Sequence, residues 1–235
     1  MQRRQFVTGS AAMLGAMTIG TMSAPSTTYA EAPIARGVPL KAPKSGKINV
    51  AFAIAEGANV IDLAGAWEVF QDVHVGRRMP FRLYTVAATT DPIIATGGLQ
   101  IVPKFSVEDA PQPDLIPVGA LRSNPALTEW LASASRDTDV TMSVCTGAYQ
   151  LGKAGLLDGL EATTHHDFYD NFEETFPEVR VQRGLRFVEN EHIATAGGLT
   201  SGIDLALRTV ERYFGRDVAQ ATADYMEYRS TGWQV

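Results

Sequence analysis

The apolar positions of this chain recur with two periods, one typical of buried strands and one typical of helices that pack on a sheet. Short apolar runs with β-branched residues predict strands at residues 47–54, 81–88, 114–118, 139–144, 181–188 and 192–195. Longer runs with apolar residues three and four positions apart predict helices at residues 60–72, 124–135, 146–157, 167–176, 200–214 and 217–228. Residues 93–94 and 99–102, with Gly97-Gly98 between them, predict a hairpin.

The order of these elements indicates the fold class. Strands that alternate with helices predict an α/β fold, with a mostly parallel sheet and helices on both of its faces. Asn124 followed by Pro125 is a helix start signal, which supports the helix at residues 124–135. Residues 47–235 are numerous enough for one domain with a full core. We therefore expect a single three-layer α/β/α sandwich.

The first 30 residues have the composition of an export signal. A twin arginine at positions 3 and 4 precedes an uncharged, mildly apolar stretch, and small residues end it at Ala30. A retained membrane anchor is the alternative, but residues 7–22 are too few and too rich in glycine for a spanning helix, which needs about 20 apolar residues. We expect twin-arginine export to the periplasm, cleavage after Ala30, and a flexible linker over residues 31–46.

Charge and cysteine content narrow the function classes. The chain has a net charge of −6, and loss of residues 1–30 would leave 18 basic and 26 acidic side chains, a net charge of −8. An acidic domain without a basic stretch is a poor candidate for binding nucleic acid. Cys145 is the only cysteine, so no internal disulfide can form. A lone thiol in an oxidising compartment is either well buried or kept for its chemistry.

Cys145 lies between the strand predicted at 139–144 and the helix predicted at 146–157, which is the position of a nucleophile elbow. The amino terminus of that helix would favour the thiolate, and such sites lower a cysteine pKa from about 8.5 toward roughly 3.5–7.5. The same N–H groups could stabilise an anion that forms during attack. The alternative is a small buried core residue. The strand-to-helix position favours a reactive thiol.

Four ordered motifs carry a resemblance to a known family. Residues 143–159, Ser-Val-Cys-Thr-Gly-Ala-Tyr-Gln-Leu-Gly-Lys-Ala-Gly-Leu-Leu-Asp-Gly, resemble the nucleophile segment of the ThiJ/PfpI superfamily, which is class I glutamine amidotransferase-like. Residues 61–65 resemble its acid-bearing segment. Residues 162–165 and 196–207 resemble downstream motifs of its isonitrile hydratase branch. The match covers residues 47–228 and implies a flavodoxin-like sandwich with a cysteine nucleophile.

The resemblance also implies site residues beside Cys145. Asp62 matches the acidic partner of the thiol and would give a proton to the substrate carbon, whereas the alternative for Asp62 is a helix cap. Thr146 stands where proteases and glyoxalase-like members carry histidine, which argues against a peptidase that needs an imidazole base. His165 matches a position near the pocket, with a structural histidine as the alternative. Gly119 and Ala120 would line the substrate pocket and hold an oxyanion.

The segment that contains Gly119 departs from the family. Residues 115–120 read Leu-Ile-Pro-Val-Gly-Ala, whereas the family usually has a Pro-Gly-Gly turn at this place. Ala120 does not reach the backbone conformations of glycine as readily. The segment therefore departs from the family at the place where the oxyanion site is expected.

No metal or cofactor is expected. The four histidines, His74, His165, His166 and His192, lack ligand spacing such as His-x-x-x-His. The resemblance implies a small-molecule substrate, no nucleic-acid partner, no membrane contact after signal removal, and a homodimer.

Three functions remain open. The first is a cofactor-free lyase in which the Cys145 thiolate attacks an isonitrile and Asp62 supplies a proton, so that water releases an N-formamide. The second is glyoxalase-like thiol chemistry on small electrophiles, against which the absence of histidine beside Cys145 counts. The third is a non-catalytic ligand or redox sensor, which the altered 115–120 segment favours.

Overall fold

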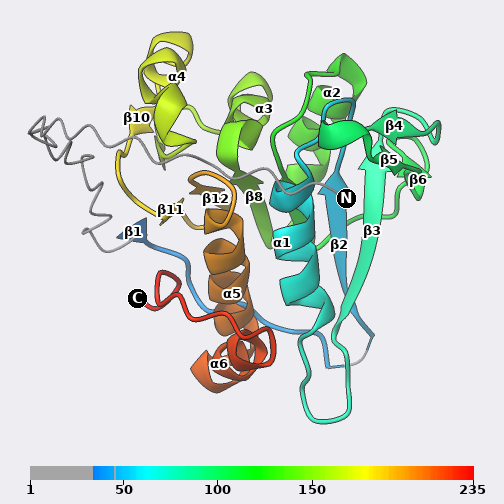
Figure 1. Cartoon of the computed structure of the whole chain (residues 1–235), viewed down its shortest axis with the longest axis vertical. Coiled ribbons are helices and arrows are strands. Elements are labelled where there is room, and N and C mark those ends of the chain that lie inside the picture. Colours follow the sequence, from blue (N-terminus) through cyan, green and yellow to red (C-terminus); the bar gives the residue numbers. More distant parts are fainter. Residues whose placement is uncertain (1–33, 45) are drawn as a thin grey trace, which may run out of the picture.

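An eight-stranded sheet lies at the centre of the protein, whose computed structural model describes residues 34–44 and 46–235 (Figure 1). The strand order is β1-β11-β12-β8-β7-β2-β3-β6. Its strands are β1 (Ile34–Ala35), β2 (Ile48–Ala53), β3 (Phe81–Ala87), β6 (Phe105–Ser106), β7 (Leu115–Val118), β8 (Val140–Val144), β11 (Phe187–Glu189) and β12 (Ile193–Ala196). The β11–β12 pair is antiparallel, and the other neighbouring pairs are parallel.

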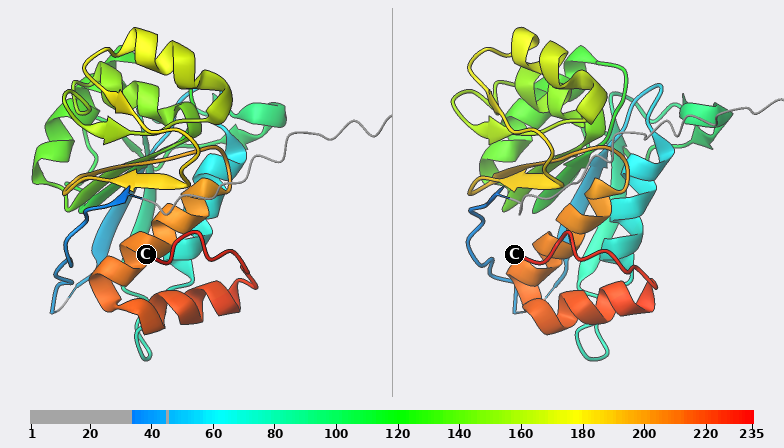
Figure 2. Two further views of the ribbon diagram at one scale, coloured as in Figure 1. Left: turned by 90° about the vertical axis from the view of Figure 1, so that its left-hand side faces the viewer. Right: turned by 60° about the vertical axis from the view of Figure 1, so that its left-hand side comes forward.

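Helices cover both faces of this sheet, as Figures 1 and 2 show. One face carries α1 (Val60–Gln71), α5 (Ser201–Phe214) and α6 (Arg216–Tyr225). The other face carries α2 (Pro125–Ala134), α3 (Ala148–Lys153) and α4 (Tyr169–Thr175). The predicted three-layer α/β/α sandwich with a mostly parallel sheet is confirmed. Among the helices in the described part of the chain, none combines the length and apolar character needed to cross a membrane.

Short elements complete the architecture. The hairpin predicted around Gly97 is present as β4 (Ile93–Ile94) and β5 (Gln100–Ile101), which pair antiparallel. A separate two-stranded pair joins β9 (Glu161–Ala162) to β10 (Arg180–Val181). Four 3-10 turns are η1 (Thr96–Gly98), η2 (Ser135–Asp137), η3 (Cys145–Gly147) and η4 (His166–Phe168).

The central strands are mostly apolar because both of their faces are buried. Successive side chains of a strand point to opposite faces. In β7, Leu115 joins the core beneath α1 and α5, whereas Ile116 joins the core beneath α2 and α3. Two cores on one sheet fix the strand register from both sides, and this register places the ends of β7 and β8 side by side.

Residues 34–44 do not form the flexible linker that the sequence predicts over 31–46. β1 pairs in parallel with β11, and the Leu40 amide donates a 2.8 Å hydrogen bond to the carbonyl of Arg212. Arg212 Nε donates in turn to the carbonyl of Val38 at 2.9 Å, and Arg212 also forms a buried ion pair with Glu189 at 3.1 Å. These partners are distant in the sequence, so the local composition of the segment did not reveal them. The predicted export signal and residues 31–33 lie outside the described residues.

Other elements also differ from their predicted bounds: the helix predicted at 167–176 is η4 followed by α4, and the helix predicted at 217–228 ends at Tyr225. The strand predicted at 181–188 is two short strands, β10 and β11, because the chain turns at Gly184, which has a φ of +77°. The helix predicted at 146–157 begins with η3 and ends as α3 at Lys153. Gly155 follows with a φ of +70°, a left-handed conformation that ends helices.

Candidate active site

Cys145 stands at the turn between β8 and α3, so the predicted nucleophile elbow is present. Its φ is 59°, a left-handed conformation that is costly for a residue with a Cβ atom. Two hydrogen bonds hold it there: the Cys145 amide donates to the carbonyl of Gly197 at 2.8 Å, and Thr164 Oγ1 donates to the carbonyl of Cys145 at 2.9 Å. The thiol is therefore placed by contacts from β12 and the loop before η4.

Two glycines allow the backbone to approach this elbow closely. A Cβ atom on Gly147 would lie 2.2 Å from the carbonyl oxygen of Val118, and one on Gly119 would lie 2.7 Å from Cβ of Asp62. Neither glycine has a positive φ, so the close contact itself requires glycine at these positions. The end of β7 consequently packs directly against both the elbow and the first turn of α1.

The carboxyl of Asp62 is buried in the first turn of α1, with 1% of the residue exposed. The Ala120 amide donates a 2.9 Å hydrogen bond to Asp62 Oδ2. Asp62 Oδ1 has no hydrogen-bond partner within the described residues. The helix is capped by Asn59, whose side chain accepts from the Ile61 amide at 3.2 Å. Asp62 is therefore not the helix cap, and its free oxygen remains available for chemistry.

The Asp62 carboxyl and the Cys145 thiol lie close enough for each to alter the pKa of the other. Burial raises the pKa of Asp62 to about 6, although the Ala120 amide and the contact with Cys145 oppose this rise. Burial and then the charge of Asp62 raise the pKa of Cys145 to about 11, against the opposing effects of the Thr146 and Leu199 amides and the Thr146 hydroxyl. At neutral pH the pair holds one proton, and that proton resides on sulfur.

This raised pKa of Cys145 contradicts the lowered pKa that the sequence predicts from the helix amino terminus. The residue is 6% exposed, so desolvation opposes the thiolate. The nearby carboxylate of Asp62 opposes it further. The N–H groups at the elbow act in the predicted direction but do not outweigh these two effects. Ionisation of the thiol therefore requires that its proton move to a neighbouring base.

A groove of about 540 Å³ opens beside the elbow and runs along α3. It is lined by Leu121, Ser123, Thr146, Tyr149, Gln150, Lys153, Phe168 and Asn171. Thr146 links the groove to the nucleophile, because it lines the groove, directly follows Cys145, and its hydroxyl acts to lower the pKa of the Cys145 thiol. A second, much narrower cavity adjoins Asp62, Gly119 and Ala120.

The Ala120 backbone has a different partner from the one the family resemblance implies. Its amide, expected to help hold an oxyanion, instead donates to Asp62. The Leu199 amide is one of the groups that act to lower the pKa of the Cys145 thiol, and Leu199 has a φ of 52°. No pattern in the sequence pointed to Leu199, because its orientation depends on the turn between β12 and α5.

The described contacts of His165 are with Gly198, Asp167 and His166. Its ring packs on Gly198, where a Cβ atom would lie 2.3 Å from His165 Cδ2, and its Nδ1 accepts from the Asp167 amide at 3.3 Å. The rings of His165 and His166 stack with centroids 4.3 Å apart. Ligand atoms of these histidines and Asp167 lie within 4.8 Å of one another, a grouping of metal-ligating types that spacing on a helix face did not predict. It arises because His165 precedes η4 with extended backbone.

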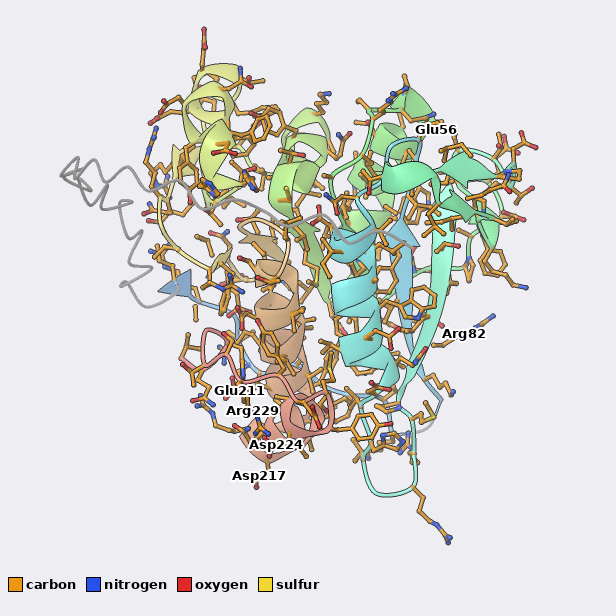
Figure 3. All side chains as sticks on the ribbon, viewed as in Figure 1. Glu56, Arg82, Glu211, Asp217, Asp224 and Arg229 are labelled. Atoms are coloured by element: carbon orange, nitrogen blue, oxygen red, sulfur yellow. The ribbon has the colours of Figure 1, made fainter. Side chains whose placement is uncertain are left out.

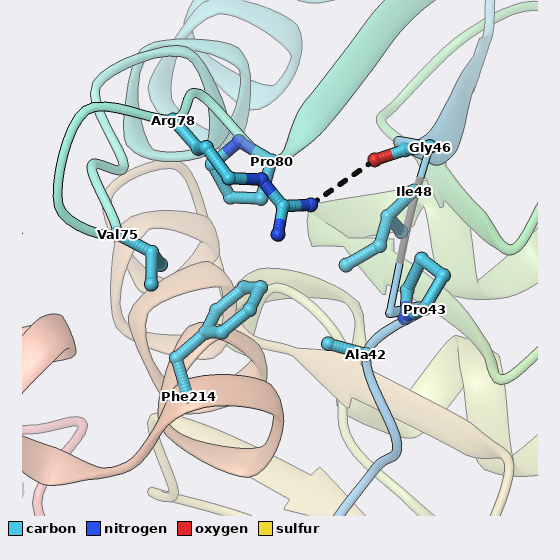
Figure 4. A pocket seen from close by; sticks show the side chains of 8 residues that line it. All are labelled: Ala42, Pro43, Gly46, Ile48, Val75, Arg78, Pro80 and Phe214. Carbon is cyan, nitrogen blue, oxygen red and sulfur yellow. Dashed lines mark hydrogen bonds between the residues drawn. The ribbon is translucent and has the colours of Figure 1, made fainter.

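A further cavity of about 340 Å³ lies at the opposite end of the sheet (Figure 4). It is enclosed by the segment before β2, the loop before β3 and the end of α5, and Arg78 donates a 3.3 Å hydrogen bond across it to the carbonyl of Gly46. Charged side chains such as Glu211, Asp217 and Asp224 surround this end of the molecule near α6 (Figure 3). None of the residues that line this cavity belongs to the elbow.

Comparisons with known proteins agree with this architecture. The sequence model of the DJ-1/PfpI family matches residues 48–212. The chain is 30% identical over 187 residues to a protein named isonitrile hydratase from Pseudomonas putida, covering 77% of this chain and 78% of that protein. It is also 30% identical over 173 residues to the HTH-type transcriptional regulator CdhR from Pseudomonas aeruginosa, covering 72% of this chain but 51% of the regulator. The chain thus spans about half the length of that regulator.

A solved structure shows the same fold. The crystal structure of a ThiJ/PfpI family protein from Pseudomonas syringae superposes on this chain with a TM-score of 0.71 and 26% sequence identity. The superposition covers 81% of this chain and 78% of the other.

Proposed function

This chain belongs to the DJ-1/PfpI family, and we propose that it is a cofactor-independent hydro-lyase that adds water to a small isonitrile to give an N-formamide. The observation that carries the proposal is the proton-sharing pair of Cys145, held at the elbow, and the buried carboxyl of Asp62. The 30% identity to isonitrile hydratase over most of both chains supports this choice of substrate.

The first step moves the thiol proton to Asp62 and then to the substrate. Asp62 Oδ1 accepts the proton from Cys145 while the sulfur forms a bond to the terminal carbon of the isonitrile. The protonated carboxyl then gives the proton to that same carbon. The product is a thioimidate in which the former isonitrile carbon carries one hydrogen and a bond to sulfur.

Water completes the reaction. It adds to the thioimidate carbon, one of its protons passes to the nitrogen, and the carbon–sulfur bond breaks as the carbonyl forms. The second water proton returns to sulfur, so the pair regains its single proton. The sum is the isonitrile plus one water giving one N-formamide.

The environment of Asp62 suits these two roles. A carboxyl with a pKa of about 6 is ionised at neutral pH and can accept a proton, yet it is basic enough to hold that proton until the carbon takes it. The Ala120 amide holds Oδ2 in place and leaves Oδ1 for the transfer. The hydroxyl of Thr146 supports the sulfur as negative charge develops there.

A ligand or redox sensor is the second candidate. The observation that favours it is the similarity to a transcriptional regulator over 72% of this chain. A sensor would bind or be modified at the same site without turnover.

The proposal extends to location and assembly. We propose that the chain is exported by the twin-arginine route, acts in the periplasm and forms a homodimer. The twin arginine at positions 3 and 4 supports export, and the family resemblance supports the dimer.

The test is direct. Phenyl isonitrile is incubated with the purified chain and with Cys145→Ala, and formanilide is measured by chromatography. Turnover that disappears in the variant supports the hydratase. Stoichiometric modification of Cys145 without formanilide overturns it in favour of the sensor.

A further inference from the structure

The groove beside the elbow follows one face of a single helical segment. Thr146, Tyr149, Gln150 and Lys153 line it, and their spacing of three, four and seven residues places them on the same side of η3 and α3. Seven residues rise by about 10 Å along a helix. The groove therefore begins at the residue that contacts the nucleophilic sulfur and ends about 10 Å away at Lys153.

Lys153 gives the far end of the groove a positive charge. It is the one charged residue among the eight that line the groove. Within the described residues no carboxylate forms an ion pair with it, whereas arginines such as Arg183 and Arg216 have acidic partners. Because no acidic side chain lines the groove, the ammonium group of Lys153 favours an anionic ligand there.

Aromatic side chains form the middle of the groove. Tyr149 and Phe168 both line it, with ring centroids 6.5 Å apart in an edge-to-face arrangement. Tyr149 is held in place because its hydroxyl donates to Asn171 Oδ1 at 2.7 Å and its ring packs on Phe172 at 4.9 Å between centroids. Walls of this kind accept a flat apolar group, and their fixed orientation reduces the entropy cost of binding.

From these three features we propose that the groove binds the aromatic ring and the carboxylate of an aromatic carboxylic acid whose reactive group lies at Cys145. The aromatic ring packs against the wall that Tyr149 and Phe168 form, and the carboxylate meets Lys153. This inference rests on the proposed function and narrows its substrate class to isonitriles of aromatic acids. It identifies Lys153 as the residue that determines specificity.

The experiment compares a charged and a neutral substrate of the same shape. Values of kcat/KM are measured for 4-isocyanobenzoate and 4-isocyanobenzamide with the unmodified chain, Lys153→Gln, Lys153→Arg and Lys104→Gln. Lys104 is an exposed lysine just before β6 and does not line the groove, so it controls for net charge. We expect the chain to prefer the acid, and Lys153→Gln to lower the acid-to-amide ratio by about fivefold. Lys153→Arg should restore most of the preference.

Salt provides a second readout. The preference for the acid should decline as ionic strength rises in the unmodified chain and stay flat in Lys153→Gln, because screening weakens an exposed charge pair. An acid-to-amide ratio that is unchanged in Lys153→Gln overturns the inference while the hydratase proposal stands.

A binding measurement separates the two proposals if neither isonitrile is hydrated. The affinity for 4-formamidobenzoate is then measured by calorimetry with the same four proteins, since this measurement needs no turnover. Binding that weakens about fivefold in Lys153→Gln but not in Lys104→Gln supports the groove assignment even without hydratase activity. Equal affinity in all four proteins, or no binding, overturns it.

Discussion

The Ala120 amide donates a 2.9 Å hydrogen bond to one oxygen of Asp62 and leaves the other oxygen without a partner among the described residues. A carboxyl held in this way keeps its orientation while one oxygen exchanges a proton with Cys145. From the sequence we expected the backbone at Ala120 to help hold an oxyanion. In the structure its amide holds the Asp62 carboxyl instead, so the segment that departs from the family pattern orients the acid of the proposed catalytic pair.

Removal of the nucleophile tests the assignment of Cys145. Cys145→Ser should lower formamide production at least about 10³-fold, because a serine hydroxyl beside a carboxyl of pKa about 6 is a much weaker nucleophile than the thiol. The rate with phenyl isonitrile measures the effect, and circular dichroism checks that the variant is folded. Activity within tenfold of the unmodified chain would exclude attack by sulfur.

The shared proton of Asp62 and Cys145 predicts a bell-shaped pH profile. Activity should rise through about pH 6 as Asp62 becomes a base, and should fall through about pH 11 as the pair loses its remaining proton. The profile of kcat/KM measures both limbs. An acidic limb below pH 5 would show that Asp62 does not control the rate.

Substitution of Asp62 should also change the thiol. In Asp62→Asn the negative charge that raises the pKa of Cys145 is absent, so the thiol pKa should fall below that of the unmodified chain. Thiolate absorbance at 240 nm, followed against pH, measures it. Activity should nevertheless fall, since the amide cannot carry the proton. A thiol pKa that rises in this variant would contradict the arrangement of the pair.

The same substitution has a predicted effect on stability. Burial raises the pKa of Asp62 to about 6 in the folded chain, above the value of about 3.9 in an unfolded chain. Between about pH 4 and about pH 6 the Asp62 carboxyl keeps its proton in the folded chain and loses it in the unfolded chain. The free energy of unfolding therefore falls as pH rises through this range. An asparagine at position 62 does not ionise, so Asp62→Asn lacks this pH-dependent fall in stability. The variant should be more stable than the unmodified chain by about 2–3 kcal/mol at pH 8, with little difference at pH 4. Urea unfolding at both pH values measures it.

The close approach at Gly147 predicts a steric requirement. Gly147→Ala places a Cβ atom 2.2 Å from the carbonyl oxygen of Val118, so β7 and the elbow must move apart. We expect a loss of about 1–3 kcal/mol in the free energy of unfolding, together with reduced activity. Gly155→Ala is the matched control: it meets nothing within 4 Å and has only its φ of +70° to oppose it, so its activity should be unchanged.

The buried pair of Arg212 and Glu189 predicts how the amino-terminal segment is held. Arg212→Met leaves Glu189 with one cation fewer and removes the hydrogen bond to Val38, so stability should fall by about 3–5 kcal/mol. Hydrogen exchange at residues 34–40 should increase in the same variant. Arg183→Gln, which removes exposed ion pairs with Asp170 and Glu173, should have no resolvable effect on either measurement.

Much of the fold was predictable because most of its elements follow from local signals. The strand at β8 and the helix at α2 were expected within one residue at each end, since a buried apolar run and the Asn124-Pro125 cap are visible in the sequence. The positions of Cys145 at the elbow and of the hairpin around Gly97 followed from the same kind of signal.

The parts that were missed depend on contacts between distant residues. The docking of residues 34–40 depends on Arg212, far along the chain, and the sulfur contact of Leu199 depends on a turn with positive φ. The pKa of Cys145 depends on burial, which periodicity near the elbow does not reveal. The residues that line the groove along α3 could have been grouped from the sequence, because the spacing of Thr146, Tyr149 and Lys153 follows the period of a helix.

The ends of the central sheet have a consequence for association between copies. The outermost strand β6 contains two residues. Such a short edge offers few free peptide groups, and this limits the extension of the sheet into that of a neighbouring molecule. The edge at β1 is moreover backed by the buried charges of Arg212 and Glu189, so opening it would expose them. We therefore expect any homodimer of this chain to meet through helices or loops, and the protein to resist strand-to-strand aggregation for as long as its first strand stays docked.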